Sequence, residues 1–148
     1  MRRIGFEVRY LANLIKKTLD NTPTFQKNKS ITGMQYFIIC FIYKNSDRDV
    51  LQKDIEKRFH MQKSTTSQII YTMEKNGLII REKVDYDKRT KKIVLTNLAL
   101  MIKDEAKKEI NQLEQNIVQG LTEEEIEQFY YVVDKIKKNI QDKEQNLW

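Results

Sequence analysis

The stretch that decides the fold covers residues 51–95 and reads LQKDIEKRFHMQKSTTSQIIYTMEKNGLIIREKVDYDKRTKKIVL. Leu51, Ile55 and Phe59 repeat every four residues, which predicts a short amphipathic helix. Residues 60–62 predict a tight turn, and residues 63–76 predict a second helix that Gly77 ends in the left-handed conformation. Two helices joined by so short a turn predict a helix-turn-helix pair.

The second half of this stretch predicts a two-stranded hairpin. Residues 78–84 are rich in β-branched side chains, residues 85–90 are charged, and residues 92–95 alternate again. The charged residues are expected to form the tip. A hairpin that follows a helix-turn-helix pair is called a wing, and we use that name for residues 78–95.

Longer helices are predicted on both sides of residues 51–95. Apolar residues from Ile4 to Leu19 recur at three- and four-residue steps, and a capping box of Thr32 and Gln35 begins a helix that runs to about residue 45. That helix is apolar in nearly every direction, so it is expected to be a core element covered on most sides. Thr96 can cap a long helix that breaks near Gly120, and a second capping box of Thr122 and Glu125 begins the last helix.

Composition agrees with a mainly α fold that contains a small β-hairpin. The chain has 148 residues, four glycines, one proline and 32% charged residues, which favours solvated helices with short turns. The longest apolar run, residues 36–43, is too short to span a bilayer, and charges interrupt any signal-like segment near the start. We therefore expect a cytoplasmic protein with no membrane partner. The net charge of +6 would attract a polyanion if the cations gather on one face.

Double-stranded DNA is the polyanion that this arrangement suits. A second helix of a helix-turn-helix pair fits the major groove, and a wing can reach the adjacent minor groove. The expected contacts are short polar or cationic side chains at the helix start, two residues further along its face, and three wing cations. They are Lys63, Ser64, Thr65, Thr66, Ser67, Gln68, Tyr71, Lys75, Lys88, Arg89 and Lys91. Asp87 is expected to orient Arg89 within the wing.

A known family shares these features. The run Met73-Glu74-Lys75-Asn76-Gly77-Leu78-Ile79, then Arg81, Asp87-Lys88-Arg89 and Leu95-Thr96, resembles the MarR family of bacterial transcription regulators in both residues and spacing. The resemblance covers essentially the whole chain. It implies a winged helix-turn-helix domain at residues 30–96 and a helical dimerisation region formed by residues 1–29 and 97–148. Three positions depart from the family pattern: Glu56, Thr66 and Ala99.

The predicted function is a DNA-binding transcription regulator, a repressor, that binds a pseudo-palindromic duplex site as a homodimer. A small phenolic or anionic effector that releases the DNA is an additional expected partner. Two alternatives stay open: a winged-helix protein-interaction module without DNA binding, and a redox-sensing regulator that acts through Cys40. The sequence argues against the second alternative, because Cys40 lies in an apolar run without a neighbouring cation, which favours a buried, inert thiol.

Catalysis and cofactor binding are not expected. No nucleophile and base occur in a recognisable spacing, and His60 is the single histidine of the chain. We therefore expect no enzyme activity, no cofactor and no metal site.

Overall fold

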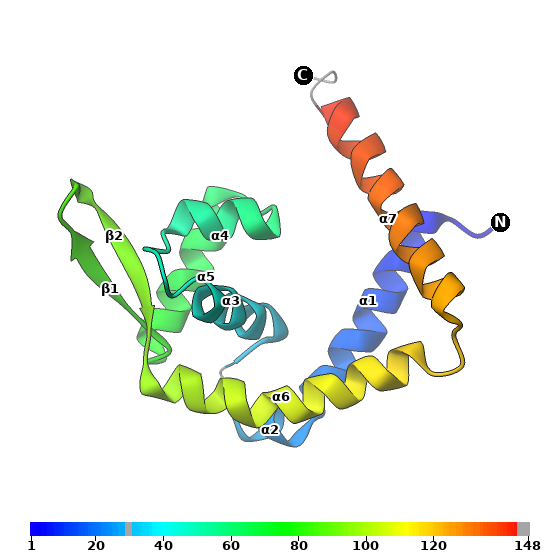
Figure 1. Ribbon diagram of the computed structural model, residues 1–148, viewed down its shortest axis with the longest axis horizontal. Coiled ribbons are helices and arrows are strands. Elements are labelled where there is room, and N and C mark those ends of the chain that lie inside the picture. Colours follow the sequence, from blue (N-terminus) through cyan, green and yellow to red (C-terminus); the bar gives the residue numbers. More distant parts are fainter. Residues whose placement is uncertain (29–30, 145–148) are drawn as a thin grey trace. The chain divides into compact units, whose positions relative to one another are not determined.

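The computed structural model describes residues 1–28 and 31–144 (Figure 1). Its elements in chain order are α1 (Ile4–Asp20), α2 (Pro23–Lys27), α3 (Gly33–Lys44), α4 (Gln52–Phe59), α5 (Lys63–Lys75), β1 (Ile79–Val84), β2 (Asp87–Leu95), α6 (Asn97–Val118) and α7 (Glu123–Glu144). The predicted fold class, mainly helical with one antiparallel hairpin, is confirmed.

The chain forms two compact units, Met1–Asn111 and Gln112–Trp148. The dimerisation and DNA-binding regions predicted from the sequence meet between residues 29 and 30 and again between residues 96 and 97. Residues 29 and 30 lie outside the described residues, and so do residues 145–148. That division stays a prediction.

Helix α3 provides much of the core of the first unit. The Thr32 hydroxyl accepts a hydrogen bond from the Gln35 N–H at 3.2 Å, and the Gln35 side chain accepts one from the Thr32 N–H, so the predicted capping box is confirmed. Ile38 and Ile39 are fully buried. The neighbours of α3 come from several elements: Phe25 of α2 contacts Tyr36, Phe59 of α4 contacts Phe41, and Lys103 of α6 lies over the Tyr43 ring. Phe37, however, is 47% exposed, and Met34 and Tyr43 are exposed too, so part of the helix surface stays open.

The helix pair α4–α5 ends as its sequence predicts. His60 adopts the left-handed conformation with φ of 50° in the turn between the helices. After α5, Gly77 has φ of 73°, its N–H donates to the Glu74 carbonyl, and the Leu78 N–H donates to the Met73 carbonyl at 2.9 Å. This is a Schellman motif, which satisfies the last carbonyls of the helix and turns the chain into β1.

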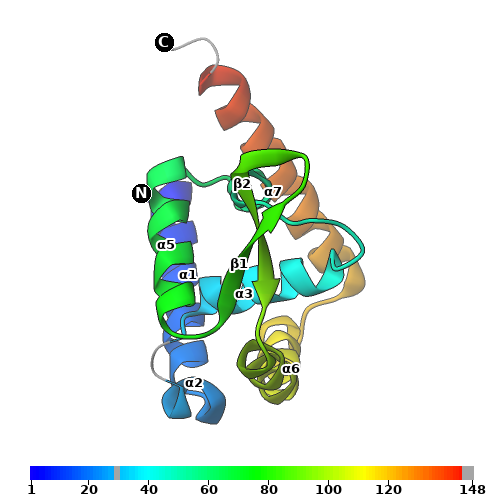
Figure 2. The same ribbon diagram turned by 90° about the vertical axis from the view of Figure 1, so that its left-hand side faces the viewer.

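The wing pairs β1 with β2 in register from Ile79↔Leu95 to Lys83↔Lys91. Figure 2 looks onto this hairpin, with α5 beside β1. The register then shifts, and Val84 pairs with Asp87. The tip is therefore a two-residue turn at residues 85 and 86, and the predicted charged tip of residues 85–90 is too long, because β2 begins at Asp87. Residues 88–90 bulge from β2. The consecutive residues Lys83 and Val84 on β1 pair with Lys91 and Asp87 on β2, which leaves the three residues between them without partners on β1.

Thr96 joins the two ends of the wing. Its hydroxyl donates to the Gly77 carbonyl at 2.6 Å, and its N–H donates to the Leu78 carbonyl at 3.1 Å. The same hydroxyl accepts from the Ala99 N–H at 3.3 Å, as the predicted cap of α6. One residue thus connects the end of α5, the start of β1 and the first turn of α6.

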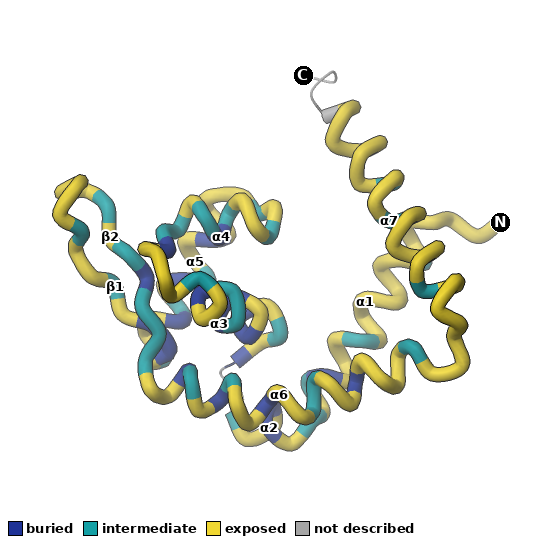
Figure 3. The backbone as a smooth tube through the Cα atoms, viewed as in Figure 1, coloured by how far each residue is buried: buried dark blue, intermediate teal, exposed yellow. Residues whose placement is uncertain are grey.

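Helix α7 lies in the second unit and begins at a capping box. The Thr122 hydroxyl accepts from the Glu125 N–H at 3.1 Å, and the Glu125 carboxylate accepts from the Thr122 N–H at 2.8 Å, as predicted. Most of α7 is exposed (Figure 3), and on the apolar face expected for this helix Phe129 and Ile140 are more than half exposed. Helix α1 has the same character, with Phe6 67% exposed.

Candidate nucleic-acid interface

The start of α5 presents polar side chains to solvent. Lys63, Ser64, Thr65, Ser67 and Gln68 are all exposed. Tyr71 and Lys75, further along the helix, are exposed as well. Ser64, Gln68, Tyr71 and Lys75 follow at steps of four, three and four residues, so they share one helix face. This face has the length and chemistry that groove recognition requires.

Thr66 was predicted to contact DNA, and its position in the structure does not allow this. Its side chain is fully buried, and its hydroxyl donates to the Gln62 carbonyl at 3.0 Å within the helix. It lies on the inward stripe with Ile70 and Met73, at four- and three-residue steps. This spacing could have identified Thr66 as a core residue, since the family pattern often has an apolar residue here.

Asp87 organises the wing through the main chain. One carboxylate oxygen accepts from the Arg89 N–H at 2.9 Å, and the other accepts from the Thr90 hydroxyl at 2.8 Å. The backbone hydrogen bond first, and the hydroxyl second, hold the pKa of Asp87 below its usual value. Asp87 therefore fixes the bulge on which Arg89 stands, and the Lys88, Arg89 and Lys91 side chains extend into solvent.

A hollow of about 440 Å³ separates the start of α5 from the wing. Its walls come from α4, α5 and both strands, and cations dominate them. The cationic residues around it are Lys53, Lys63, Arg81, Arg89 and Lys91, with Glu56 as the one carboxylate. The helix start and the wing thus turn their charges toward one opening, which neither element could provide alone.

Sequence reasoning had not assigned Lys53 and Arg81 to this surface. Arg81 lies on β1 with its Nε 3.6 Å from a Glu74 carboxylate oxygen, and that nitrogen is buried without a hydrogen-bond partner. Its place in the family-like pattern was the available signal. Lys53 is the exposed second residue of α4 and had no comparable signal.

A second hollow, of about 270 Å³, lies between α3 and α6. Cys40 lines it together with Tyr36, Tyr43, Lys44, Lys103, Lys107 and Asn111. The expectation of a buried cysteine without a nearby cation is wrong, because Cys40 is half-buried and α6 brings lysines to the same hollow. The Lys103 Nζ lies 4.0 Å from the centre of the Tyr43 ring. Burial first, and the neighbouring Cys40 second, raise the pKa of the Tyr36 phenol.

No cluster of three or more histidine, cysteine or carboxylate side chains within residues 1–28 and 31–144 is arranged to hold a metal ion. None of the described helices combines the length and the apolar character needed to cross a membrane.

Comparison with known proteins identifies the family. The MarR family model matches residues 29–90. The chain is similar to the transcription regulator MarR from Oenococcus oeni PSU-1, with 24% identity over 92% of this chain and 99% of that one and a TM-score of 0.74. S. aureus MepR, solved in complex with DNA, is 24% identical over 95% of this chain and 99% of its own, with a TM-score of 0.83. The heme sensor protein PefR from Streptococcus agalactiae, solved with heme, is 30% identical over 94% of this chain and 95% of its own, with a TM-score of 0.67. With its winged helix-turn-helix elements in place and these matches along most of its length, the chain belongs to the MarR family of transcription regulators.

Proposed function

We propose that this regulator is a repressor that binds a pseudo-palindromic site on double-stranded DNA as a homodimer. The observation that carries the proposal is the group of five cations around the hollow between α5 and the wing. A surface that neutralises several phosphates releases condensed counterions, which provides most of the affinity of proteins for duplex DNA. MepR, a relative of the same fold, was solved with DNA bound, which supports this choice of partner.

In this proposal α5 enters the major groove, with Ser64, Gln68 and Tyr71 facing the base edges. Lys63 and Lys75 contact phosphates. The wing carries Lys88, Arg89 and Lys91 to the adjacent minor groove, whose narrow form attracts cations. Asp87 holds the Arg89 backbone for that contact.

The exposed apolar helices support the homodimer. On α1, the residues that a single chain leaves exposed are Ile4, Phe6, Val8, Tyr10, Leu11 and Leu14. On α7 they are Phe129, Tyr130, Tyr131, Val132 and Ile140. Apolar surface on this scale is uncommon on monomeric proteins, and a second copy would bury it. Residues 1–29 and 97–148 would then form the dimerisation region, and two heads would read half-sites roughly 10 base pairs apart.

The test measures DNA binding as a function of salt. We expect the protein to bind a duplex from its own upstream region, with log K falling linearly against log salt. Lys63→Ala should lower the slope by about one unit, because one phosphate contact is lost. Arg89→Ala should weaken binding to this duplex more than binding to a scrambled duplex, because in this proposal the Arg89 side chain enters the minor groove.

The control is Lys138→Ala, which removes an exposed cation from α7 and should leave the slope unchanged. If the wild-type protein binds no duplex even at low ionic strength, the proposal fails. The alternative of a protein-interaction module without DNA binding would then take its place.

A second proposal concerns release from DNA, and the hollow beside Cys40 favours it. Three lysines around about 270 Å³ suit a small anion, and the aromatic rings of Tyr36 and Tyr43 suit a flat one. We propose that a small aromatic anion binds there and releases the DNA. The redox alternative uses the same hollow, since the half-buried Cys40 lines it.

Two probes separate these routes of release. Benzoate should weaken DNA binding by the wild type, and Lys103→Met, which keeps most of the side-chain volume, should abolish that response. Peroxide should leave DNA binding unchanged in the wild type and in Cys40→Ser alike. A response to peroxide that disappears in Cys40→Ser, with none to benzoate, would replace the effector proposal by the redox one.

A further inference from the structure

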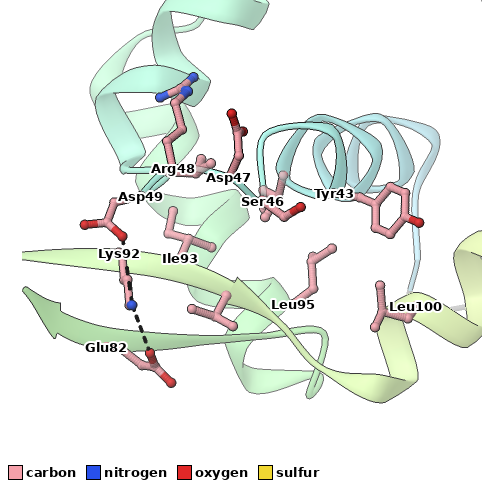
Figure 4. Close-up of a pocket in the computed structure, with 13 residues that line it drawn as sticks. Tyr43, Ser46, Asp47, Arg48, Asp49, Glu82, Lys92, Ile93, Leu95 and Leu100 are labelled. Atoms are coloured by element: carbon pink, nitrogen blue, oxygen red, sulfur yellow. Dashed lines mark ion pairs between the residues drawn. The ribbon is translucent and has the colours of Figure 1, made fainter.

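A third hollow, of about 490 Å³, lies between the loop that follows α3, the wing and the start of α6 (Figure 4). Its floor is apolar, with Val50 and Ile93 buried beneath it. Ion pairs cross its rim. The Lys92 Nζ lies 3.9 Å from Asp49 Oδ1 and 3.6 Å from Glu82 Oε2, and Figure 4 shows the two carboxylates on opposite sides of the ammonium group.

The base of the wing is held by burial and by a backbone hydrogen bond. Ile79 and Ile93 are buried, and the Ile93 N–H donates to the Val50 carbonyl at 2.8 Å. In the outer part of the wing, residues 82–92, Glu82 and Lys92 line this hollow, and residues 89–91 line the hollow beside α5. Within residues 1–28 and 31–144, the ion pairs that leave this outer part for the rest of the unit end on Asp49.

Tyr86, in the turn at the tip, approaches the same carboxylate. Reduced hydration first, and then the charge of Asp49 and a hydrogen bond to it, raise the pKa of the Tyr86 phenol. A phenol can donate a hydrogen bond to a carboxylate, and Asp49 is the carboxylate named in this shift. Asp49 thus faces Lys92 on β2 and Tyr86 at the tip, two points on the outer wing.

We propose that Asp49 is a positioning residue for the wing: through Lys92 and Tyr86 it holds the outer hairpin at the angle that brings Lys88 and Arg89 to DNA. This inference rests on the proposed function. Asp49 does not itself contact DNA in this proposal. A two-part reading surface binds well only when both parts reach the duplex together, so a wing that swings about its base weakens specific binding.

The sign of the effect separates positioning from simple charge. Asp49 is an acidic group near a cationic surface, so removing its charge should strengthen DNA binding if charge alone matters. Removing a positioning residue should instead weaken binding to the specific site. The two explanations predict opposite directions for the same substitution.

Asp47 provides a matched control. It lies two residues away in the same loop, is exposed and lines the same hollow, and none of the described residues forms an ion pair or hydrogen bond with it. Asp47→Ala and Asp49→Ala therefore change the net charge equally. Asp49→Glu restores the charge and the acceptor oxygens and serves as the rescue.

The experiment compares these variants by fluorescence anisotropy on a duplex from the upstream region and on a scrambled duplex. We expect Asp49→Ala to weaken binding to the upstream duplex by about threefold to fivefold, the upper part of the range for exposed ion pairs, and to narrow the preference of the protein for this duplex over the scrambled one. Asp47→Ala should bind both as well as the wild type or better. Asp49→Glu should recover most of the loss.

The free protein gives a second measurement, because it involves no DNA. The ¹⁵N order parameters of the Lys88 and Arg89 amides should fall in Asp49→Ala and stay unchanged in Asp47→Ala, with equal melting temperatures. If Asp49→Ala matches Asp47→Ala in both measurements, the inference is wrong while the proposed function stands. If the wild type binds neither duplex, the proposed function itself is wrong.

Discussion

Asp87 is the residue whose ionisation matters most for the wing. Its carboxylate accepts from the Arg89 N–H and the Thr90 hydroxyl, and these bonds lower its pKa from 3.8. A lowered pKa in the folded state means that the stabilisation is fully present above the unfolded pKa and is lost as the pH falls through the folded value. The bulge should therefore be unchanged from pH 7 to pH 5.

An NMR titration checks this. The Arg89 amide proton should move only below about pH 4, where the carboxylate takes up its proton. In Asp87→Asn that movement should disappear. A midpoint above the ordinary aspartate value would contradict the hydrogen-bonded arrangement.

Some residues of the candidate site could be predicted from the sequence, and others could not. The exposed positions on α5 could be predicted because a helix start with short polar side chains has a local chemical reason. Thr66 was misassigned, since a threonine among polar neighbours gives no sign of burial unless the inward stripe is followed back to it. Lys44 lies one helical turn after Cys40 and could be found from local sequence, whereas Lys103 lies 63 residues further along the chain and could not.

Among the elements, those with local start and stop signals were predicted best. The boxes at Thr32 and Thr122 and the Schellman turn at Gly77 depend on atoms within a few residues, so sequence alone identifies them. Helix α2 is not predicted, because its five residues are too few to show a helical period, although proline is favoured in the first helical turn. Its Thr24 N–H donates to the Glu109 carboxylate at 3.0 Å, a partner 85 residues away.

The tip of the wing illustrates a different limit. The charge pattern over residues 85–90 predicts a tip, but the turn itself covers residues 85 and 86, Asp87 pairs with Val84, and residues 88–90 bulge from β2. Pairing depends on register, and one bulge changes the register without altering composition. The two oxygens of Asp87 fix that bulge, a detail that only the folded backbone reveals.

On the scale of the whole molecule, the exposed faces of α1 and α7 should control assembly. We expect the wild type to sediment as a dimer, and Phe129→Glu and Phe6→Glu to shift it toward monomer, because a carboxylate is costly in an apolar interface. Loss of the dimer should also weaken binding to the upstream duplex, since a monomer contacts only one half-site. Analytical ultracentrifugation provides the measurement.

Gln128→Glu is the matched control, an exposed neighbour on α7 that gains the same charge. A wild type that is monomeric at the concentrations used for DNA binding would refute the homodimer. Dimers that persist in both phenylalanine variants would place the interface elsewhere.

The hydrogen bonds of Thr96 have a mechanical meaning for the reading head. Because this residue holds the Gly77 and Leu78 carbonyls while it caps α6, we expect a tilt of the first turn of α6 to displace the turn that joins α5 to β1. The connection passes through a single residue. Motion of the long α6 should therefore reach the start of the wing and the end of α5 together.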